Sequence, residues 1–321
     1  EWLEAALECR PRQPAQYALA MSDVDEAEED PKRYDFGFIA STDDHTARPG
    51  TGYKQYERRK MTFATGVKSK MWEYQYKAED PNFPEIPKIT PGESQPDSER
   101  VSSFVYPGGI LAVHSSGRGK DAIWTALKNK NVYGTSGPRI LLWFDLINSP
   151  QGKLPMGSEI TMSQNPRFIV RAAGSLKQNP GCSKESIDSM SPKRLDYLCA
   201  GECYNPTNER EIIEKMEIIK ITPQIYAGEA VSPLIQDPWR TIPCQGKGEC
   251  IIEFEDQNFT RDSIYYVRAI QEPTPGINGS LLSERENFSL CKGSLRTDLQ
   301  DDCLSMTNER AWSSPIYVNK P

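Results

Sequence analysis

Asp43 and His45 stand two positions apart and have the side chains best suited to bind a metal ion. In an extended backbone, residues two apart point to the same side, so both side chains could converge on one point. A carboxylate oxygen and an imidazole nitrogen together suit Zn, Mn or Fe. The same Asp-x-His pattern in a turn can instead be a hydrogen-bonded cap, and two ligands do not complete a metal site.

The composition limits which sites and partners the chain can have. With only 2 histidines among 321 residues, it cannot build a histidine-rich metal centre alone. A net charge of -7 argues against nucleic acid as the main partner, because phosphate binding needs a basic face. No apolar run approaches the roughly 20 residues of a membrane helix. The length predicts a globular protein of about two domains.

The cysteines indicate an oxidising compartment. Cys9 stands alone in the first half of the chain, and the others follow in polar, turn-rich sequence, where disulfides stabilise secreted domains. These later cysteines are Cys182, Cys199, Cys203, Cys244, Cys250, Cys291 and Cys303. The alternative is a four-cysteine zinc site made of Cys199, Cys203, Cys244 and Cys250. Neither pair has the two intervening residues that are usual in a zinc knuckle.

Short separations favour two of the disulfides, Cys244–Cys250 and Cys291–Cys303. Cys182 is expected to pair with Cys199 or Cys203, which leaves one cysteine free or paired with Cys9. We therefore expect an exported protein that is periplasmic, on the cell surface or extracellular. Glycosylation sequons at Asn258, Asn278 and Asn287 fit export.

Hydrophobic patterning predicts a change of architecture near residue 138. Before it, residues 34–40 and 109–114 are predicted strands and residues 120–130 a helix, with a proline-rich loop at 78–100. After it, alternating apolar residues and Gly/Pro turns predict an antiparallel β-sandwich. Trp124 and Trp143 are expected in the core. The strands predicted in the second part are residues 140–144, 159–162, 168–172, 215–221, 250–254, 264–269 and 316–318.

Long motifs along the chain carry a resemblance to a known family. The first is the stretch FGFIASTDDHTARPGTGYK at residues 36–54, which contains Asp43 and His45. A second block covers residues 108–140, and three further motifs lie at 202–206, 265–273 and 311–316. In order and spacing these motifs resemble domain of unknown function 3604, a family similar to the PHP (polymerase and histidinol phosphatase) metal-dependent phosphoesterases.

The resemblance implies an α/β fold followed by an all-β one. Residues 1–138 would be the C-terminal part of a distorted (β/α)7 barrel, and residues 139–321 a disulfide-stapled β-sandwich. Asp43 and His45 would be late ligands to one to three divalent ions (Zn, Mn or Fe), with most ligands supplied from outside this chain. Because the chain opens within a helix pattern and lacks the family's early ligands, we expect the N-terminal half of the protein as its partner, either cleaved or as a separate chain.

The expected chemistry is hydrolysis by metal-activated water. Asp43 would bind the metal and accept a proton. Arg48 and Lys54, just beyond the ligands, would hold a small anionic substrate, although solvated loop charges are the simpler interpretation. His114 would lie at the rim of the pocket or serve as a hydrogen-bonded structural histidine.

The sequence thus predicts an exported, phosphoesterase-like metal-dependent hydrolase. Two alternatives stay open. One is a non-catalytic cell-surface or filament protein, and the other is a module that binds glycans or a partner protein.

Overall fold

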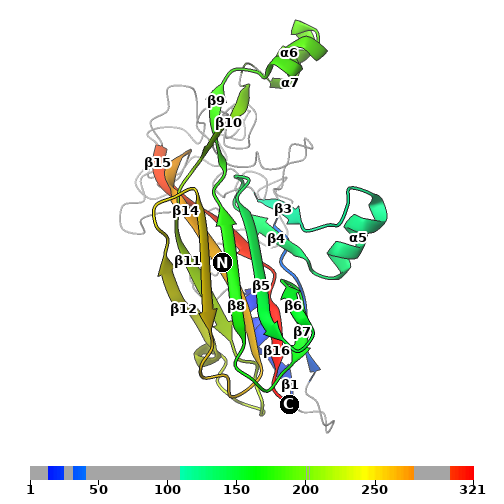
Figure 1. Cartoon of the computed structure of the whole chain (residues 1–321), viewed down its shortest axis with the longest axis vertical. Helices are drawn as coiled ribbons and strands as arrows, with labels where there is room; N and C mark the ends of the chain where they lie inside the picture. The colour runs from blue at the N-terminus through cyan, green and yellow to red at the C-terminus, as the bar shows by residue number, and fades with distance from the viewer. Residues whose placement is uncertain (1–13, 25–31, 41–108, 200, 202, 278–303) are drawn as a thin grey trace, which may run out of the picture.

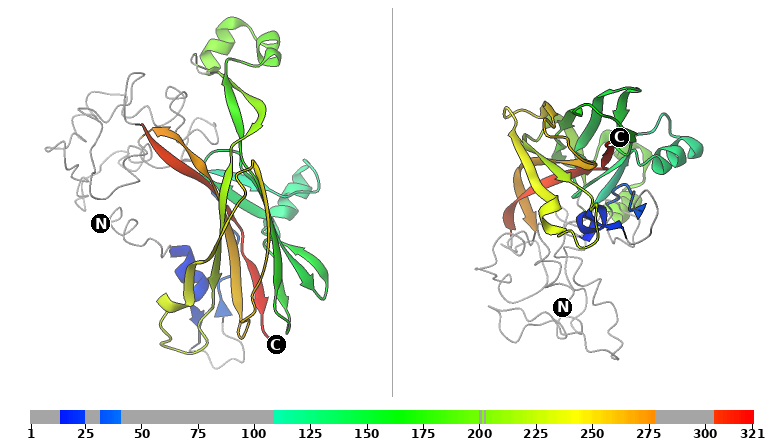
Figure 2. Two further views of the ribbon diagram at one scale, coloured as in Figure 1. Left: turned by 60° about the vertical axis from the view of Figure 1, so that its left-hand side comes forward. Right: turned by 90° about the horizontal axis from the view of Figure 1, so that it is seen from below.

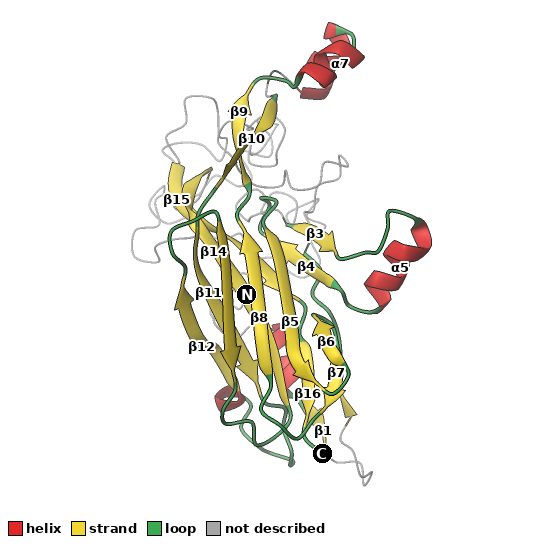
Figure 3. Cartoon of the chain, in the orientation of Figure 1, coloured by secondary structure: helices red, strands yellow, loops and turns green. Residues whose placement is uncertain are grey.

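The computed structural model describes residues 14–24, 32–40, 109–199, 201, 203–277 and 304–321. Strands dominate this part of the chain (Figures 1 and 3). Most of them belong to two sheets that share one hydrophobic core. None of the helices among these residues is long and apolar enough to cross a membrane.

The larger sheet is built mainly from antiparallel strands, which follow one another in the spatial order β12-β11-β14-β15-β4-β3. β16 pairs with β14 and, in parallel, with β7. The bounds are β12 (Ile235–Pro243), β11 (Ile213–Ile221), β14 (Ser263–Ile277), β15 (Leu304–Ser313), β4 (Val132–Thr135), β3 (Ile110–Val113), β16 (Ile316–Asn319) and β7 (Glu159–Thr161).

The smaller sheet is antiparallel throughout, in the order β13-β8-β5-β6. Its strands are β13 (Glu249–Glu255), β8 (Arg167–Ala173), β5 (Leu141–Ser149) and β6 (Gly152–Pro155). In β5, Leu142, Phe144 and Leu146 are buried and alternate with more exposed neighbours. This period of two sends every second side chain toward the facing sheet.

Aromatic rings fill the centre of the core between the sheets. Phe168 is fully buried, and its ring centroid lies 5.3 Å from that of Phe144, 4.9 Å from Phe254 and 4.8 Å from Tyr265. Three of these rings come from the smaller sheet and Tyr265 comes from the larger one. The cluster therefore holds the two layers together.

Two helical segments lie outside this core. The arm, formed by β9 (Leu176–Pro180), α6 (Lys184–Ser189), α7 (Pro192–Cys199) and β10 (Tyr204–Arg210), projects beyond one end of the sheets (Figures 1 and 2). α5 (Lys120–Lys128) joins β3 to β4 and buries only Ala126. Trp124 on this helix is 61% exposed, so the prediction that it lies in the core was wrong.

The N-terminal part of the described chain packs beside the larger sheet. It contains α2 (Pro14–Ala20) and the short pair β1 (Ser22–Asp23) and β2 (Lys32–Arg33). Leu19 and Ala20 of α2 share a second apolar cluster with residues of β11, β14 and β16 and with the turn η4 (Ser232–Leu234).

The predicted fold class was wrong. The described chain is mostly strand in open sheets, and no (β/α) barrel is evident in it. The segment β3-α5-β4 has the order of a barrel repeat, but its two strands pair antiparallel, so α5 is not a crossover between parallel strands. Through β4 and β15, strands from both sides of residue 138 belong to one sheet.

Individual elements agree better with the sequence. All the strands predicted after residue 138 are present, as are the strand before His114 and the helix that follows it. Residues 34–40 were predicted to form a strand, but they form none; the nearest strand is the short β2, which ends at Arg33. The backbone of residues 34–40 instead bonds to the side chains of Ser314 and Tyr317 near the C-terminus, as described below.

Replacing Phe168 by Ala should lower the free energy of unfolding by about 3–5 kcal/mol, because it opens a cavity among three neighbouring aromatic rings. Urea unfolding followed by tryptophan fluorescence measures the change. The matched control is Trp124→Ala, which removes a larger but exposed ring and should cost less than about 0.5 kcal/mol. Equal losses in both variants would contradict the core described here.

Candidate functional site

The larger sheet carries an open groove of about 920 Å³ on the face turned away from the core. The pleat of β11 and β14 produces it. In β11, Met216 and Ile218 enter the core, whereas Lys215 and Glu217 line the groove. In β14 the same alternation brings Arg268 to the groove.

Arg268 is the electrostatic centre of the groove. It lies directly opposite Glu217 across β11 and β14, and its Nε donates to Glu217 Oε2 at 2.9 Å. Its two terminal nitrogens donate to the two carboxylate oxygens of Asp237, one of them at 3.1 Å. The Asp237 side chain is only 3% exposed. A buried carboxylate of this kind needs such partners to offset the cost of leaving water.

Gln16 of α2 completes this network. The amide is buried, and its Nε2 donates to Asp237 Oδ2 and to the Tyr266 hydroxyl, both at 2.7 Å. Burial raises the pKa of Tyr266, and the nearby Asp237 carboxylate adds to the shift, so the hydroxyl stays protonated at neutral pH. The network fixes α2 against the sheet at the edge of the groove.

Residues 36–40 form another wall of the groove. The Phe36 N–H donates to the Tyr317 hydroxyl at 2.9 Å, and that hydroxyl donates to the Phe36 carbonyl at 2.8 Å. The Phe38 N–H donates to Ser314 Oγ at 3.0 Å, and the Phe38 ring meets Tyr266 edge-on at 5.1 Å. Side chains of β16 and of the link between β15 and β16 therefore hold this segment in place, and it forms no strand pairing with them.

A glycine permits the close approach of this segment to β4. A side chain at Gly134 would overlap Ala40, so only hydrogen fits there. Asp43 and His45, which follow Ala40 in the sequence, lie outside the described residues, as do Arg48 and Lys54. The structure therefore describes the wall that leads to the predicted ligands.

His114 lies just after β3 and does not line the groove. Its Nε2 is 2.8 Å from the Leu142 carbonyl oxygen, so this nitrogen carries the proton. The ring also lies 5.3 Å from that of Tyr133 and 5.8 Å from that of Trp143. These contacts tie the end of β3 to β5.

Two disulfides are formed among the described cysteines. Cys244–Cys250 confirms the predicted pair, and Cys182–Cys203 resolves the alternative between Cys199 and Cys203. Because Cys203 and both members of the other pair are bonded, the four-cysteine zinc site is excluded. The disulfides indicate an oxidising environment. Cys9, Cys291 and Cys303 lie outside the described residues.

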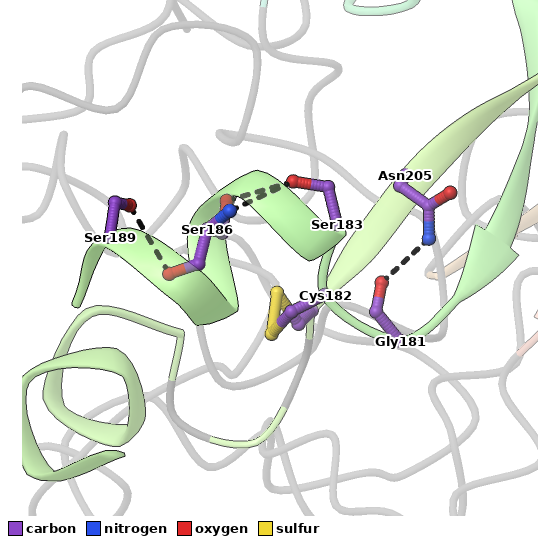
Figure 4. The surroundings of a disulfide bond; sticks show 7 residues. Gly181, Cys182, Ser183, Ser186, Ser189 and Asn205 are labelled. Atoms are coloured by element: carbon purple, nitrogen blue, oxygen red, sulfur yellow. Dashed lines mark hydrogen bonds between the residues drawn. A yellow bond between two sulfur atoms is a disulfide. The ribbon is translucent and has the colours of Figure 1, made fainter. Parts of the chain in front are cut away.

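Cys199 is the free thiol among the described cysteines, and it lies beside the arm's disulfide. Its sulfur and those of Cys182 and Cys203 are all within 4.8 Å of one another. Two contacts stabilise the turn around Cys182 (Figure 4). Asn205 Nδ2 donates to the Gly181 carbonyl at 2.9 Å, and the Ser183 side chain caps the N-terminus of α6. The three sulfurs are close enough for thiol–disulfide exchange.

The charged network of the groove was not predicted from the sequence. A signal was present in the alternation of charged and apolar residues in β11 and β14, which places Glu217 and Arg268 on one face. Asp237 gave no such signal, because its orientation depends on an irregular register in β12. The groove has the size of a small-ligand site, with polar groups fixed in orientation by one another.

Residues 24–179 match the family model described as "Protein of unknown function (DUF3604)". This match confirms the predicted resemblance to that domain of unknown function over these residues, which include the groove wall at 36–40. No curated protein and no solved structure matches the chain.

Replacing Arg268 by Ala should lower the free energy of unfolding by on the order of 3 kcal/mol, because Asp237 would keep a buried, poorly compensated charge. The control is Arg167→Ala. Arg167 is 52% exposed and lies 3.7 Å from Glu253 and 3.9 Å from Glu255, so its removal should cost at most about 1 kcal/mol. Chemical denaturation compares the two, and equal small losses would contradict the buried network.

Replacing Cys203 by Ser should produce a Cys182–Cys199 disulfide, since the Cys199 sulfur already lies within reach of Cys182. Peptide mapping without reduction detects the new pair. In the control Cys250→Ser, the arm should keep its original disulfide and Cys199 should stay open to alkylation. Recovery of Cys182 and Cys199 both alkylated from Cys203→Ser would contradict the geometry of the cluster.

Proposed function

We propose that this chain is part of an exported, phosphoesterase-like metal-dependent hydrolase, similar to the PHP enzymes in chemistry. The observation that carries the proposal is the anchoring of residues 36–40. The family motif begins in this segment, which is bonded to Tyr317 and Ser314 and lines the groove. The motif continues directly into Asp43 and His45.

Chain length supports a link between the groove and the predicted ligands. A residue spans at most about 3.6 Å, so the Cα atom of Asp43 can be no more than about 11 Å from that of Ala40. His45 is two residues further along. This range would allow both ligands to reach a molecule bound in the groove.

The donor set fits a divalent transition metal. One carboxylate and one imidazole suit Zn, Mn or Fe, and the N-terminal half of the protein would supply the remaining ligands. When bound, such an ion would lower the pKa of a water molecule and polarise the scissile bond. Asp43 would accept a proton from the attacking water, and Arg48 and Lys54 would hold the anionic group of the substrate.

The groove adds positive charge for an anionic substrate. Lys215 is 41% exposed on the groove wall, where its Nζ lies 3.1 Å from Glu217 Oε1, and Arg310 also lines the groove. Lys215 lies on β11 and Arg310 on β15, on either side of β14, which carries Arg268. A small phosphoester or a similar polar ester would find cationic partners along this wall.

Export is supported by the cysteines. The arm and the smaller sheet each end near a disulfide, and structural disulfides persist in the periplasm or outside the cell. A hydrolase in such a compartment would act on molecules released or presented outside the cytoplasm.

Replacing His45 by Ala in the full-length protein should abolish stoichiometric Zn, Mn or Fe binding and hydrolysis of a phosphomonoester probe. Elemental analysis after dialysis measures the metal, and release of inorganic phosphate measures the reaction. The matched control is His114→Ala, which should keep the metal because His114 bonds to a backbone carbonyl away from the groove. Wild-type protein without metal, or His45→Ala with full metal content, would contradict the proposal.

A second candidate is a binding module for glycans. The favouring observation is the groove itself, which combines the aromatic side chains Phe38 and Trp312 with polar groups held rigidly by mutual hydrogen bonds. A glycan array probed in the presence of a chelator separates the two functions. Binding that persists without metal and is lost in Lys215→Ala supports this candidate.

A further inference from the structure

A lysine and an aspartate lie in contact inside the core. Lys220 of β11 is 6% exposed and Asp256, just after β13, is fully buried. The Lys220 Nζ atom contacts Asp256 Oδ2. β11 belongs to the larger sheet and β13 to the smaller one, so this contact joins the two layers.

Aromatic rings surround the pair and keep water away. The Lys220 ammonium lies 5.3 Å from the ring centroid of Trp239 and 5.9 Å from that of Tyr265. Tyr265 lies directly opposite Lys220 across β11 and β14. Two charges in such a place are expensive, because the cost of leaving water can exceed their mutual attraction. A simple ion pair is thus a poor way to stabilise this core.

The remaining hydrogen bonds of Asp256 have an arrangement suited to chemistry at its carboxyl carbon. The Asn258 N–H donates to Oδ1 at 3.0 Å, and the Tyr265 hydroxyl donates to Oδ2 at 2.5 Å. Oδ1 therefore has a backbone donor that can stabilise negative charge, as in an oxyanion hole. Oδ2, the oxygen that Lys220 contacts, has a proton donor beside it.

We propose that Lys220 and Asp256 condense after folding into an intramolecular amide bond that links the two sheets. The pair starts as ammonium and carboxylate, and transfer of one proton from Nζ to Oδ2 removes both charges. The Nζ lone pair then attacks Cγ, and Asn258 N–H stabilises the developing charge on Oδ1. A second proton passes from Nζ through the Tyr265 hydroxyl to Oδ2, which leaves as water.

The condensation needs no oxidant, reductant or further reactant. The ammonium and the carboxylate give one amide N–H and one water molecule. The two groups are held in contact by the fold, which supplies the proximity that a bimolecular condensation lacks. Expulsion of water into the solvent from a dry core favours the amide over the acid and amine.

The protonation of the neighbouring groups is compatible with this route. Burial raises the pKa of Tyr265 and the Asp256 carboxylate raises it further, so the hydroxyl keeps a proton to donate. For Asp256, burial acts to raise the pKa, but the hydrogen bonds from Lys220 and Tyr265 outweigh it, and the carboxyl starts ionised. The initial proton transfer is therefore the uphill step.

Intact mass spectrometry of the full chain, denatured and with all disulfides reduced, tests the proposal. The wild-type protein should weigh one water molecule less than its sequence. Lys220→Arg keeps the positive charge but cannot form the amide, so it should have the full mass. The matched control Lys215→Arg changes a lysine of the same strand that faces the groove, and it should keep the deficit.

Protease mapping locates the bond. Trypsin should fail to cleave after Lys220 in the wild-type protein, and tandem spectra should contain a branched peptide joining Lys220 to Asp256. Tyr265→Phe keeps the ring but removes the hydroxyl, so the cross-linked fraction should form more slowly after refolding. Full mass in the wild-type protein would overturn the proposal. A deficit that survives in Lys220→Arg would also overturn it, since it would come from another source such as a cyclised aspartate.

Discussion

The pleat of β11 and β14 is the constraint on which both polar clusters depend. One set of side chains on these strands enters the core, and the alternate set forms the groove. The shared register places Glu217 opposite Arg268 on the outer face and Lys220 opposite Tyr265 on the inner face. A slip of one residue would exchange the two faces, so the groove and the core are specified by the same pairing.

An irregularity in β12 adds to this arrangement. The pairing of β11 with β12 shifts between Ile218 and Lys220, where extra residues of β12 face one residue of β11. Asp237 and Trp239 are two apart and would face the same side in a regular strand, yet Asp237 lines the groove and Trp239 packs on the core. The bulge therefore supplies a carboxylate to one cluster and an aromatic cover to the other.

The parts of the structure that could be predicted from the sequence are the local ones. Alternation located the strands, and a short separation gave the Cys244–Cys250 disulfide. The local sequence pattern could not show whether the predicted barrel was correct. It gives the order strand, helix, strand, and this order is the same whether the two strands pair parallel or antiparallel. Residues 34–40 have the composition of a strand, but their backbone partners are Tyr317 and Ser314, far along the chain.

The candidate site was predictable only as a motif. Residue type and spacing led to the prediction of Asp43 and His45 as ligands, whereas the Arg268 network can be recognised only once the fold is known. The geometry also explains why the segment matched by the family model is not a complete structural unit. That match ends at residue 179, in β9, but β4 pairs with β15, and the groove wall at 36–40 bonds to Ser314 and Tyr317.

A piece ending at residue 179 would also lose β11, β12 and β14, and with them Asp237, Glu217 and Arg268. The C-terminal strands are therefore what positions the start of the motif that precedes the predicted ligands. The all-β part and the start of the motif therefore form one structural unit. A bond between Lys220 and Asp256 would act on that unit directly, because it would fix β11, which lines the groove, to the smaller sheet behind it.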